Sequence, residues 1–402
     1  MIFVFYFFAA LLIWLSYRSF RGGIEYLRYF RVELAKSPSD FTPFATIIAP
    51  CRGVDEGMRE NLTALFEQDY PKYEILFVVA DADDSAVSVI EEEITRRNSA
   101  IVASNLIVAT KATDCSQKVE NLREAVLHVA GASCVFAFVD SDARPAKNWL
   151  RSLVAPLEND GVGATTGYRW FISEKPTFAT EMNSVWNASI ATALGAKTDS
   201  NFCWGGSMAM RRDTFERIDM REKWRGTLSD DFAVTRAMNE AKLPIVFVPQ
   251  AMCASIENCS FGKMLEFTTR QMKITRVYAP TLWILSFVGS GLFNAVILAA
   301  ILIIIFNREN TLHVVAAITT LFLVCSFSVG KAYLRLKAVR LILTTHDTEL
   351  RRQTFAQTTL FLFTPIIFFY NSVAALLSRR LTWRGTIYEL KSPSETVIIT
   401  GK

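Results

Sequence analysis

Long apolar runs lie at both ends of the chain, and shorter alternating patterns fill the middle. The apolar runs cover residues 1–16, 281–306, 311–330 and 355–377. The three late runs are each long enough to cross a hydrocarbon layer of about 30 Å, and aromatic residues after the first run extend it into the interface. We therefore predict a membrane anchor over residues 1–20, transmembrane segments over residues 281–378 and a tail over residues 379–402.

Basic residues next to the apolar runs indicate the orientation of the chain. Arg18, Arg21, Arg28 and Arg31 follow the first run, and a basic loop is expected over residues 331–352. By the positive-inside rule both face the cytoplasm, which predicts a multi-pass protein of the bacterial inner membrane with a cytoplasmic catalytic domain.

The tail conflicts with this orientation because it is also basic, with Arg379, Arg380, Arg384 and Lys391. If every run crossed once, the tail would lie outside. Either the last run is re-entrant, with Pro365 as its break, or the tail departs from the charge rule.

Short apolar segments alternate with helical patterns between residues 42 and 252. Strands are expected at residues 44–50, 73–80, 106–109 and 134–139, and helices at 60–68, 85–97 and 118–129. This alternation predicts an α/β domain over residues 42–252, built on a mostly parallel sheet with right-handed crossovers. Ligands in such sheets bind beyond the carboxyl ends of the strands.

Composition narrows the chemistry. The net charge of +4 is too small to indicate nucleic-acid binding. The seven cysteines form no C-x-x-C pair, and three scattered histidines cannot build a His-rich metal centre.

Acidic residues follow two of the predicted strands. Asp81, Asp83 and Asp84 come after residues 73–80, and Asp140 and Asp142 come after residues 134–139. Carboxylate oxygens of a D-x-D turn suit a hard divalent cation, whose shell the diphosphate of a nucleotide-sugar would complete. Solvated acidic turns are the alternative.

A third acidic pair is Asp230-Asp231, ahead of a helical pattern over residues 233–240. Inverting sugar transfer needs a base that takes the proton of the acceptor hydroxyl, and Asp231 is suited to that role. An acidic first helical turn explains the same residues equally well.

Together the motifs resemble the ceramide glucosyltransferases, a branch of the family 2 type and family 21 glycosyltransferases. The resemblance is carried by Pro50-Cys-Arg-Gly-Val-Asp55, residues 67–76 and 80–86, Lys118-Val-Glu-Asn-Leu122, Val139-Asp-Ser-Asp142, residues 205–213, Leu228-Ser-Asp-Asp-Phe232 and Arg270-Gln-Met-Lys273. Thr382-Trp-Arg-Gly385 is also similar to the tail of this family.

The resemblance implies a glycosyltransferase-A-type sheet with helices on both faces, a Mg²⁺ or Mn²⁺ ion, and inverting transfer of a hexose. Glucose from a UDP-sugar and a membrane lipid acceptor such as ceramide are the best match. The implied roles are metal binding by Asp140 and Asp142, the base at Asp231, donor binding by Pro50, Arg52, Asp81, Lys118 and Asp140, and acceptor contact by Trp204, Gly205, Gly206 and Asp230.

The next motif of the family reads Gln or Arg, two variable residues, Arg and Trp. Here Arg270 fits, Lys273 replaces Arg, and Ile274 replaces Trp, so the cation facing the diphosphate is Arg270, Lys273 or Arg276. Residues 260–280 form an amphipathic helix expected in the headgroup plane or packed on the catalytic domain. The missing Trp counts against a processive polysaccharide synthase, which stays an alternative together with a non-catalytic membrane scaffold.

Overall fold

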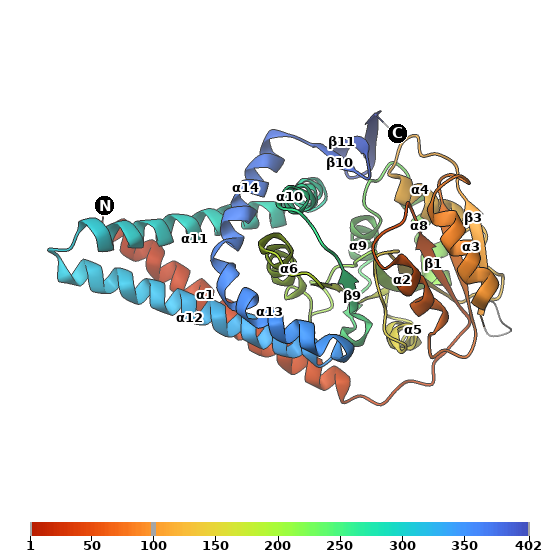
Figure 1. Cartoon of the computed structure of the whole chain (residues 1–402), viewed down its shortest axis with the longest axis horizontal. Coiled ribbons are helices and arrows are strands. Elements are labelled where there is room, and N and C mark those ends of the chain that lie inside the picture. The colour runs from red at the N-terminus through yellow and green to blue at the C-terminus, as the bar shows by residue number, and fades with distance from the viewer. Residues whose placement is uncertain (1, 98–101, 401–402) are drawn as a thin grey trace. The chain divides into compact units, whose positions relative to one another are not determined.

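The computed structural model describes residues 2–97 and 102–400 (Figure 1). The chain forms two compact units. A helical unit comprises residues 1–31, 175–192 and 259–379, and a sheet unit comprises residues 32–174, 193–258 and 380–402. Each unit is thus assembled from segments far apart in the sequence.

A seven-stranded sheet in the order β3-β2-β1-β4-β7-β5-β8 forms the centre of the sheet unit. Its strands are β1 (Ala45–Pro50), β2 (Tyr73–Val79), β3 (Val102–Val108), β4 (Val135–Val139), β5 (Ala164–Thr166), β7 (Ser207–Arg211) and β8 (Ile245–Phe247). Neighbouring strands are parallel except that β7 runs antiparallel to both β4 and β5. The predicted mostly parallel α/β sheet is confirmed.

Helices cover both faces of the sheet, since successive residues of a strand point to opposite faces. Those of the sheet unit are α2 (Met58–Phe66), α3 (Ala86–Arg97), α4 (Gln117–Ala125), α5 (Trp149–Val154), α7 (Arg212–Arg217), α8 (Met220–Lys223) and α9 (Asp230–Glu240). Leu122 of α4 joins the core that contains Leu76 of β2, whereas the ring of Phe66 in α2 packs 5.9 Å from Phe77, the next residue of that strand.

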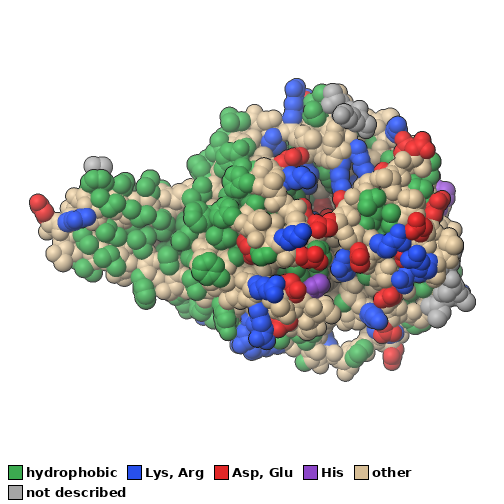
Figure 2. Space-filling view, in the orientation of Figure 1, with side chains coloured by type: hydrophobic (Ala, Val, Ile, Leu, Met, Phe, Trp, Pro, Cys, Tyr) green, Lys and Arg blue, Asp and Glu red, His purple; other side chains and the backbone are tan. Residues whose placement is uncertain are grey.

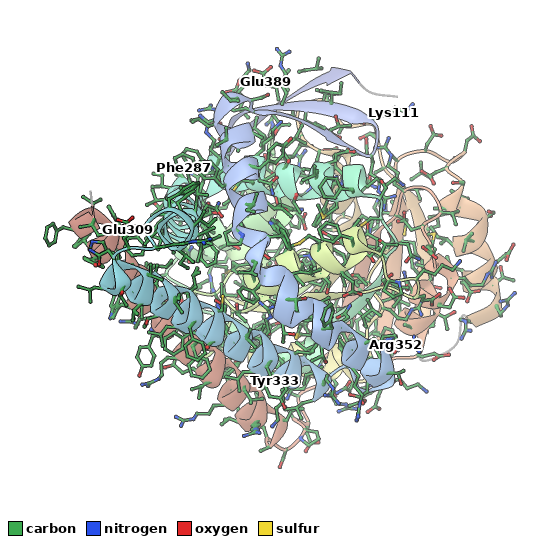
Figure 3. The ribbon with its side chains drawn as sticks, turned by 60° about the vertical axis from the view of Figure 1, so that its left-hand side comes forward. Lys111, Phe287, Glu309, Tyr333, Arg352 and Glu389 are labelled. Carbon is green, nitrogen blue, oxygen red and sulfur yellow. The ribbon has the colours of Figure 1, made fainter. Side chains whose placement is uncertain are left out.

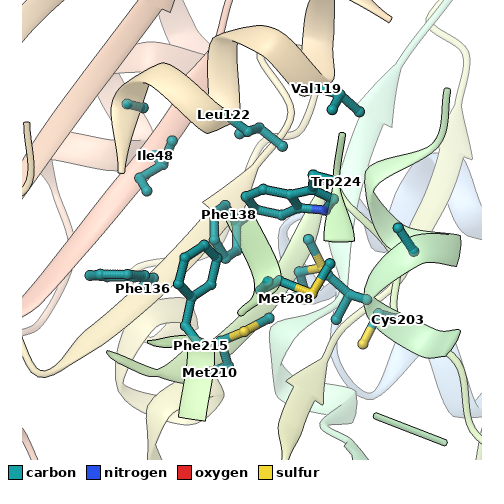
Figure 4. Packing of buried hydrophobic residues seen from close by; sticks show 14 of the residues in the cluster. Ile48, Val119, Leu122, Phe136, Phe138, Cys203, Met208, Met210, Phe215 and Trp224 are labelled. Carbon is teal, nitrogen blue, oxygen red and sulfur yellow. The ribbon is translucent and has the colours of Figure 1, made fainter. Parts of the chain in front are cut away.

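An aromatic cluster anchors the region that leads to the third acidic pair (Figure 4). The ring of Trp224 lies 5.6 Å from Phe138 and 5.4 Å from Phe215, and Trp224 is fully buried. Its indole Nε1 donates a hydrogen bond to the backbone oxygen of Asp230 over 3.1 Å. The core thereby fixes the start of α9.

Two smaller sheets complete this unit. Strands β6 (Arg169–Ile172) and β9 (Cys253–Ile256) pair in parallel. In the tail, β10 (Arg380–Trp383), β11 (Thr386–Ser392) and β12 (Glu395–Thr400) form an antiparallel sheet.

The helical unit contains most of α1 (Ile2–Leu34), together with α6 (Phe178–Ala191), α10 (Phe261–Tyr278), α11 (Pro280–Phe306), α12 (Thr311–Arg340), α13 (Asp347–Thr359) and α14 (Thr364–Leu377). In the described part of the chain, α1, α11 and α12 are long and apolar enough to span a membrane. The segments 344–362 and 364–377 bend by 58° at their junction and count as a fourth candidate only if taken together. The last apolar run is therefore broken next to Pro365.

Helices α1 and α12 both continue beyond the membrane segments that the sequence predicted. Helix α1 ends at Leu34, whereas the anchor was expected over residues 1–20. The predicted loop over residues 331–352 is wrong in its first half, since α12 continues to Arg340. Ala332, Leu336 and Val339 recur at helical spacing and are buried, which favours continuation of the helix over a loop. Figure 3 shows Glu309 at the turn between α11 and α12, with Tyr333 toward the other end of α12.

Apolar side chains cover the outside of these helices (Figure 2). Leu285, Val288 and Phe322 are each at least 60% exposed, whereas Phe5 and Val324 are buried where α1, α11 and α12 pack together. A helix bundle that exposes apolar groups and satisfies its backbone internally suits a lipid environment. The chain is thus built as a membrane protein.

Candidate active site

The acidic motifs lie at one edge of the central sheet. Asp81 follows β2 and Asp140 follows β4, and the carboxyl ends of these parallel strands lie at the same edge. Ser207, the first residue of β7, pairs with Val139, the last residue of β4. The loop that precedes β7, with Trp204, therefore reaches this edge as well. Sequence patterns did not reveal the antiparallel pairing that brings it there.

Lys118 connects the second and third acidic motifs. Its Nζ lies 2.6 Å from Oδ1 of Asp140 and 3.1 Å from Oδ1 of Asp230. The lysine stands in the first turn of α4, whose N-cap Ser116 accepts a hydrogen bond from the backbone N–H of Val119. Burial lowers the pKa of Lys118, but Asp140 and Asp230 outweigh burial and raise it, so the ammonium stays charged. It is thus a largely buried bridge between carboxylates and not a solvated surface lysine.

The Asp230 side chain is buried and closely packed. It is only 2% exposed, and burial raises its pKa to about 6 although Lys118 opposes the rise. A Cβ atom on Gly205 would lie 2.2 Å from Oδ2 of Asp230 and 2.8 Å from Nζ of Lys118. The arrangement therefore leaves no room for a side chain at position 205.

Asp231 is oriented by three donors. Its Oδ1 accepts hydrogen bonds from the Ser229 hydroxyl at 2.5 Å and from the backbone N–H of Phe232 at 2.8 Å, and its Oδ2 accepts from the backbone N–H of Gly205 at 3.2 Å. It lies in the first turn of α9 and is partly exposed, unlike its neighbour Asp230. A fixed, accessible carboxylate at this place can accept a proton from a substrate.

Asp142 carries a buried carboxylate oxygen with no partner. Its Oδ1 has no hydrogen bond among the described residues. Burial and the charge of Asp140 raise the pKa of Asp142 to about 6, while Arg169 opposes the rise. The backbone of this turn is clamped, because Asn61 Nδ2 donates to the Ser141 oxygen at 3.1 Å and Arg144 Nε donates to Asn61 Oδ1 at 2.9 Å.

The donor set at this turn fits a hard divalent cation. The described residues contain no group of three or more His, Cys, Asp or Glu side chains that could hold a metal. Asp140 and Asp142 supply two carboxylates, one with a buried oxygen that lacks a partner, and such a site is completed by oxygens of a diphosphate and water.

The remaining donor residues predicted in the sheet unit lie along the strand ends. Pro50 ends β1, and Arg52 follows it in the next loop. The Asp81 carboxylate is half exposed and lies 3.6 Å from Nζ of Lys111.

Trp204, predicted on the acceptor side, is a buried packing centre. Its ring lies 5.6 Å from that of Tyr168, and the Arg169 guanidinium lies 5.3 Å from its centroid. A Cβ atom on Gly206 would lie 2.2 Å from this ring. Gly206 therefore allows Trp204 to pack directly on the loop backbone.

The three cations predicted to face a diphosphate lie on α10 in the helical unit. Arg276 Nη1 donates to the backbone oxygens of Ala375 at 2.5 Å and Leu376 at 3.0 Å, which caps the C-terminus of α14. The Arg270 guanidinium lies 5.5 Å above the ring of Phe267. Lys273 stands between them on the same helix.

Sequence reasoning assigned no role to a contact that joins the tail to this edge. Arg384 of the β10–β11 turn binds Asp55 of the loop after β1 with both of its terminal nitrogens. Asp55 was part of a quoted motif and Arg384 part of the family-like tail, but nothing in the sequence indicated that they meet.

A mostly parallel α/β sheet with acidic turns at its strand ends, in a chain with apolar helices of membrane-spanning length, is typical of a membrane-associated glycosyltransferase. Residues 9–396 match the family described as Glycosyl transferase family 21, and the chain belongs to this family. It is therefore a glycosyltransferase.

Two solved structures are similar to the chain. The mannosyltransferase PcManGT from Pyrobaculum calidifontis, in complex with GDP-Man and Mn²⁺, is 17% identical with a TM-score of 0.45, over 92% of this chain and 98% of that one. GalNAc-T7 with UDP, GalNAc and Mn²⁺ is 12% identical with a TM-score of 0.41, over 56% of this chain and 45% of that one.

Proposed function

We propose that this glycosyltransferase moves a hexose, with glucose as the best candidate, from a UDP-sugar to the hydroxyl of a membrane lipid such as ceramide, with inversion. The observation that carries the proposal is the arrangement of Asp231. It is fixed by three donors next to the Lys118-bridged carboxylates of Asp140 and Asp230. The family and the apolar helices support a sugar transfer at a membrane.

Donor binding is assigned to the strand ends. Asp140 and Asp142 would hold Mg²⁺ or Mn²⁺, which when bound neutralises charge on the departing diphosphate. Lys118 keeps the Asp140 carboxylate in place from the side of Asp230. Pro50, Arg52 and Asp81 then lie on the side of the nucleotide.

The acceptor side is assigned to the loop before β7 and the start of α9. An acceptor hydroxyl near Asp231 would pass its proton to the carboxylate as the hydroxyl oxygen attacks the anomeric carbon. The Gly205 N–H holds one oxygen of that carboxylate, and the Ser229 hydroxyl holds the other. Within this loop the Trp204 ring packs on the backbone of Gly206, and the carboxylate of buried Asp230 packs against Gly205.

The alternatives fit less well. A processive polysaccharide synthase needs more membrane-spanning material than the three or four candidate spans of the described residues supply, and Ile274 stands where that class has Trp. A non-catalytic scaffold gives no reason for buried carboxylate oxygens without partners on Asp142 and Asp230, which cost stability.

We propose a cytoplasmic sheet unit and a tail on the same side. The Asp55–Arg384 ion pair supports this placement, since it joins the tail to the loop after β1. If α1 enters the cytoplasm, α11 leaves and α12 returns, then the bent pair α13–α14 starts and ends on the cytoplasmic side as a re-entrant element. Bending by 58° next to Pro365 is consistent with such a turn.

An impermeant thiol probe on intact cells tests this topology against the labelling of the native cysteines. Cysteine introduced at Glu309, in the turn between α11 and α12, should be labelled. Cysteines introduced at Glu56 and at Lys391 should be protected until the cells are opened. Labelling at Lys391 from outside would show that α13–α14 crosses the membrane, and labelling at Glu56 would reverse the orientation.

The catalytic base is tested by isosteric variants. Asp231→Asn keeps the shape of the side chain but cannot accept a proton, so transfer should fall by about 10²–10⁴-fold while nucleotide binding persists. Asp230→Asn is the matched neighbour, buried on Lys118. Full turnover in Asp231→Asn would remove it as the base, and a dead Asp230→Asn beside an active Asp231→Asn would move the role by one residue.

A further inference from the structure

Arg384 occupies a backbone position that disfavours its side chain. Trp383 and Thr386 pair across the β10–β11 hairpin, so Arg384 and Gly385 alone form the turn, with φ values of 50° and 79°. Two-residue turns with both φ angles positive favour Asn-Gly. For an L residue with a Cβ atom this region is costly, which points to a role for the arginine beyond the turn itself.

The side chain of Arg384 reaches the acidic edge. Nη1 lies 2.7 Å from Oδ1 of Asp55, and Nη2 lies 2.5 Å from Oδ2. The tail sheet meets the rest of the sheet unit at a second point, because a Cβ atom on Gly226 would lie 2.2 Å from the backbone oxygen of Ser394. Gly226 immediately precedes the Thr227–Asp231 segment of the active site. The tail thus contacts two loops that border the site, at Asp55 and at Gly226.

Besides Asp55, the Asp140–Asp142 turn contributes negative charge around Arg384. Its hydrogen bonds to Asp55, and then the charges of Asp142 and Asp140, raise the pKa of the guanidinium. The side chain is 41% exposed, and the two bonds to Asp55 use two of its five N–H groups. A planar guanidinium with free donors beside a cation site is suited to the oxygens of a diphosphate.

We propose that Arg384 binds the diphosphate of the nucleotide-sugar donor, and that Asp55 holds the guanidinium in place until the diphosphate replaces it as the bidentate partner. This inference rests on the proposed function, because it presupposes a nucleoside diphosphate donor. Under this proposal Arg384 is a cation of the sheet unit that binds the leaving group. It comes from the tail, which follows the membrane helices in sequence.

A purely structural clasp is the competing explanation, and two variants separate it from ligand binding. Arg384→Asn removes the charge but suits the left-handed turn, so the hairpin should keep its fold. Asp55→Asn breaks the same ion pair from the other side and leaves Arg384 available. A clasp predicts similar effects of both variants, whereas a diphosphate ligand predicts different ones.

Affinity for UDP and for UMP, with Mn²⁺ present, is measured by calorimetry on the full-length protein in lipid nanodiscs. Arg384→Asn should weaken UDP binding by about 10- to 100-fold and UMP binding much less, because charge-assisted bonds to the second phosphate are lost. Asp55→Asn should bind UDP as well as or better than wild type. Arg380→Gln is the matched control, since Arg380 lies in the same sheet and pairs with Glu389.

The measured affinities either support or overturn the role proposed for Arg384. Unchanged UDP affinity in Arg384→Asn, equal losses for UDP and UMP, or an equal loss in Asp55→Asn would overturn the role of Arg384 while leaving the proposed function standing. If wild-type protein binds no nucleoside diphosphate, the proposed function fails and this inference fails with it. An unchanged melting temperature of Arg384→Asn shows that a loss of affinity is not a loss of fold.

Discussion

The buried charge of Asp142 lowers the folding stability of the protein, and a bound metal ion would offset this loss. The folded-state pKa of Asp142, about 6, lies above the value of about 3.9 for an unfolded aspartate. The folded protein therefore binds a proton at Asp142 more tightly than the unfolded chain does, and ionisation of Asp142 lowers the stability of the fold. The cost is absent below pH ~4, where both states are protonated, and it is complete once the pH has risen through about 6. The difference between these two pKa values corresponds to about 3 kcal/mol at neutral pH.

Asp142→Asn removes this charge and keeps the shape of the side chain. Without metal at pH 7.5, the variant should be more stable than wild type by up to about 3 kcal/mol, or several degrees of melting temperature. At pH 4 the two proteins should melt together. Added Mn²⁺ with UDP should reverse the order, since wild type gains about 4.1 kcal/mol at about 1,000 times the dissociation constant and the variant gains much less.

Differential scanning fluorimetry of the full-length protein across pH 4–8 measures all of these differences. Equal stabilisation of both proteins by Mn²⁺ and UDP would remove Asp142 from the metal site. A variant less stable than wild type at pH 7.5 without metal would refute the reasoning that its charge is held at a cost.

Variants at two further positions, each with a companion variant, test the rest of the edge. Gly205→Ala should destabilise the fold by about 1–3 kcal/mol and lower transfer at least ~10-fold, because its Cβ would lie 2.2 Å from Oδ2 of Asp230, whereas Gly195→Ala, with nothing within 4 Å, should behave as wild type in melting and transfer assays. Lys118→Met should cost about 3–5 kcal/mol in a thermal melt because two carboxylates lose their shared cation, and Lys118→Arg should recover part of it. Wild-type stability in Gly205→Ala, or in Lys118→Met, would contradict the packing described for that residue.

The sequence predicted the sheet well where local patterns decide the structure. Strand β2 was expected at residues 73–80 and covers Tyr73–Val79, because all of its residues are buried and all except Glu74 are apolar or aromatic. Strand β3 was expected only at residues 106–109 but begins at Val102, since Ser104 and Asn105 interrupt its apolar pattern. Sheet pairing supplies what the local pattern lacked, as β3 runs beside β2 along its whole length.

Contacts between distant segments could not be predicted in this way. The acidic turns at Asp140 and Asp230 were recognised, but the bridge through Lys118 depends on the positions of α4 and α9 on the sheet. The same holds for Asp55 and Arg384, which are separated in sequence by α11, α12 and the bent pair α13–α14. The tail sheet was not predicted, because its strands are short and pairing among the three of them stabilises it.

The chemical nature of the product tests the central claim most directly. Membranes that contain the full-length protein are incubated with radiolabelled UDP-glucose and other UDP-sugars, with ceramide and Mn²⁺, and the products are separated by thin-layer chromatography. The proposal predicts one lipid-soluble labelled product that depends on added lipid and disappears with a chelator and in Asp231→Asn. A water-soluble labelled polymer, or no transfer from any of these donors to lipid, would contradict it.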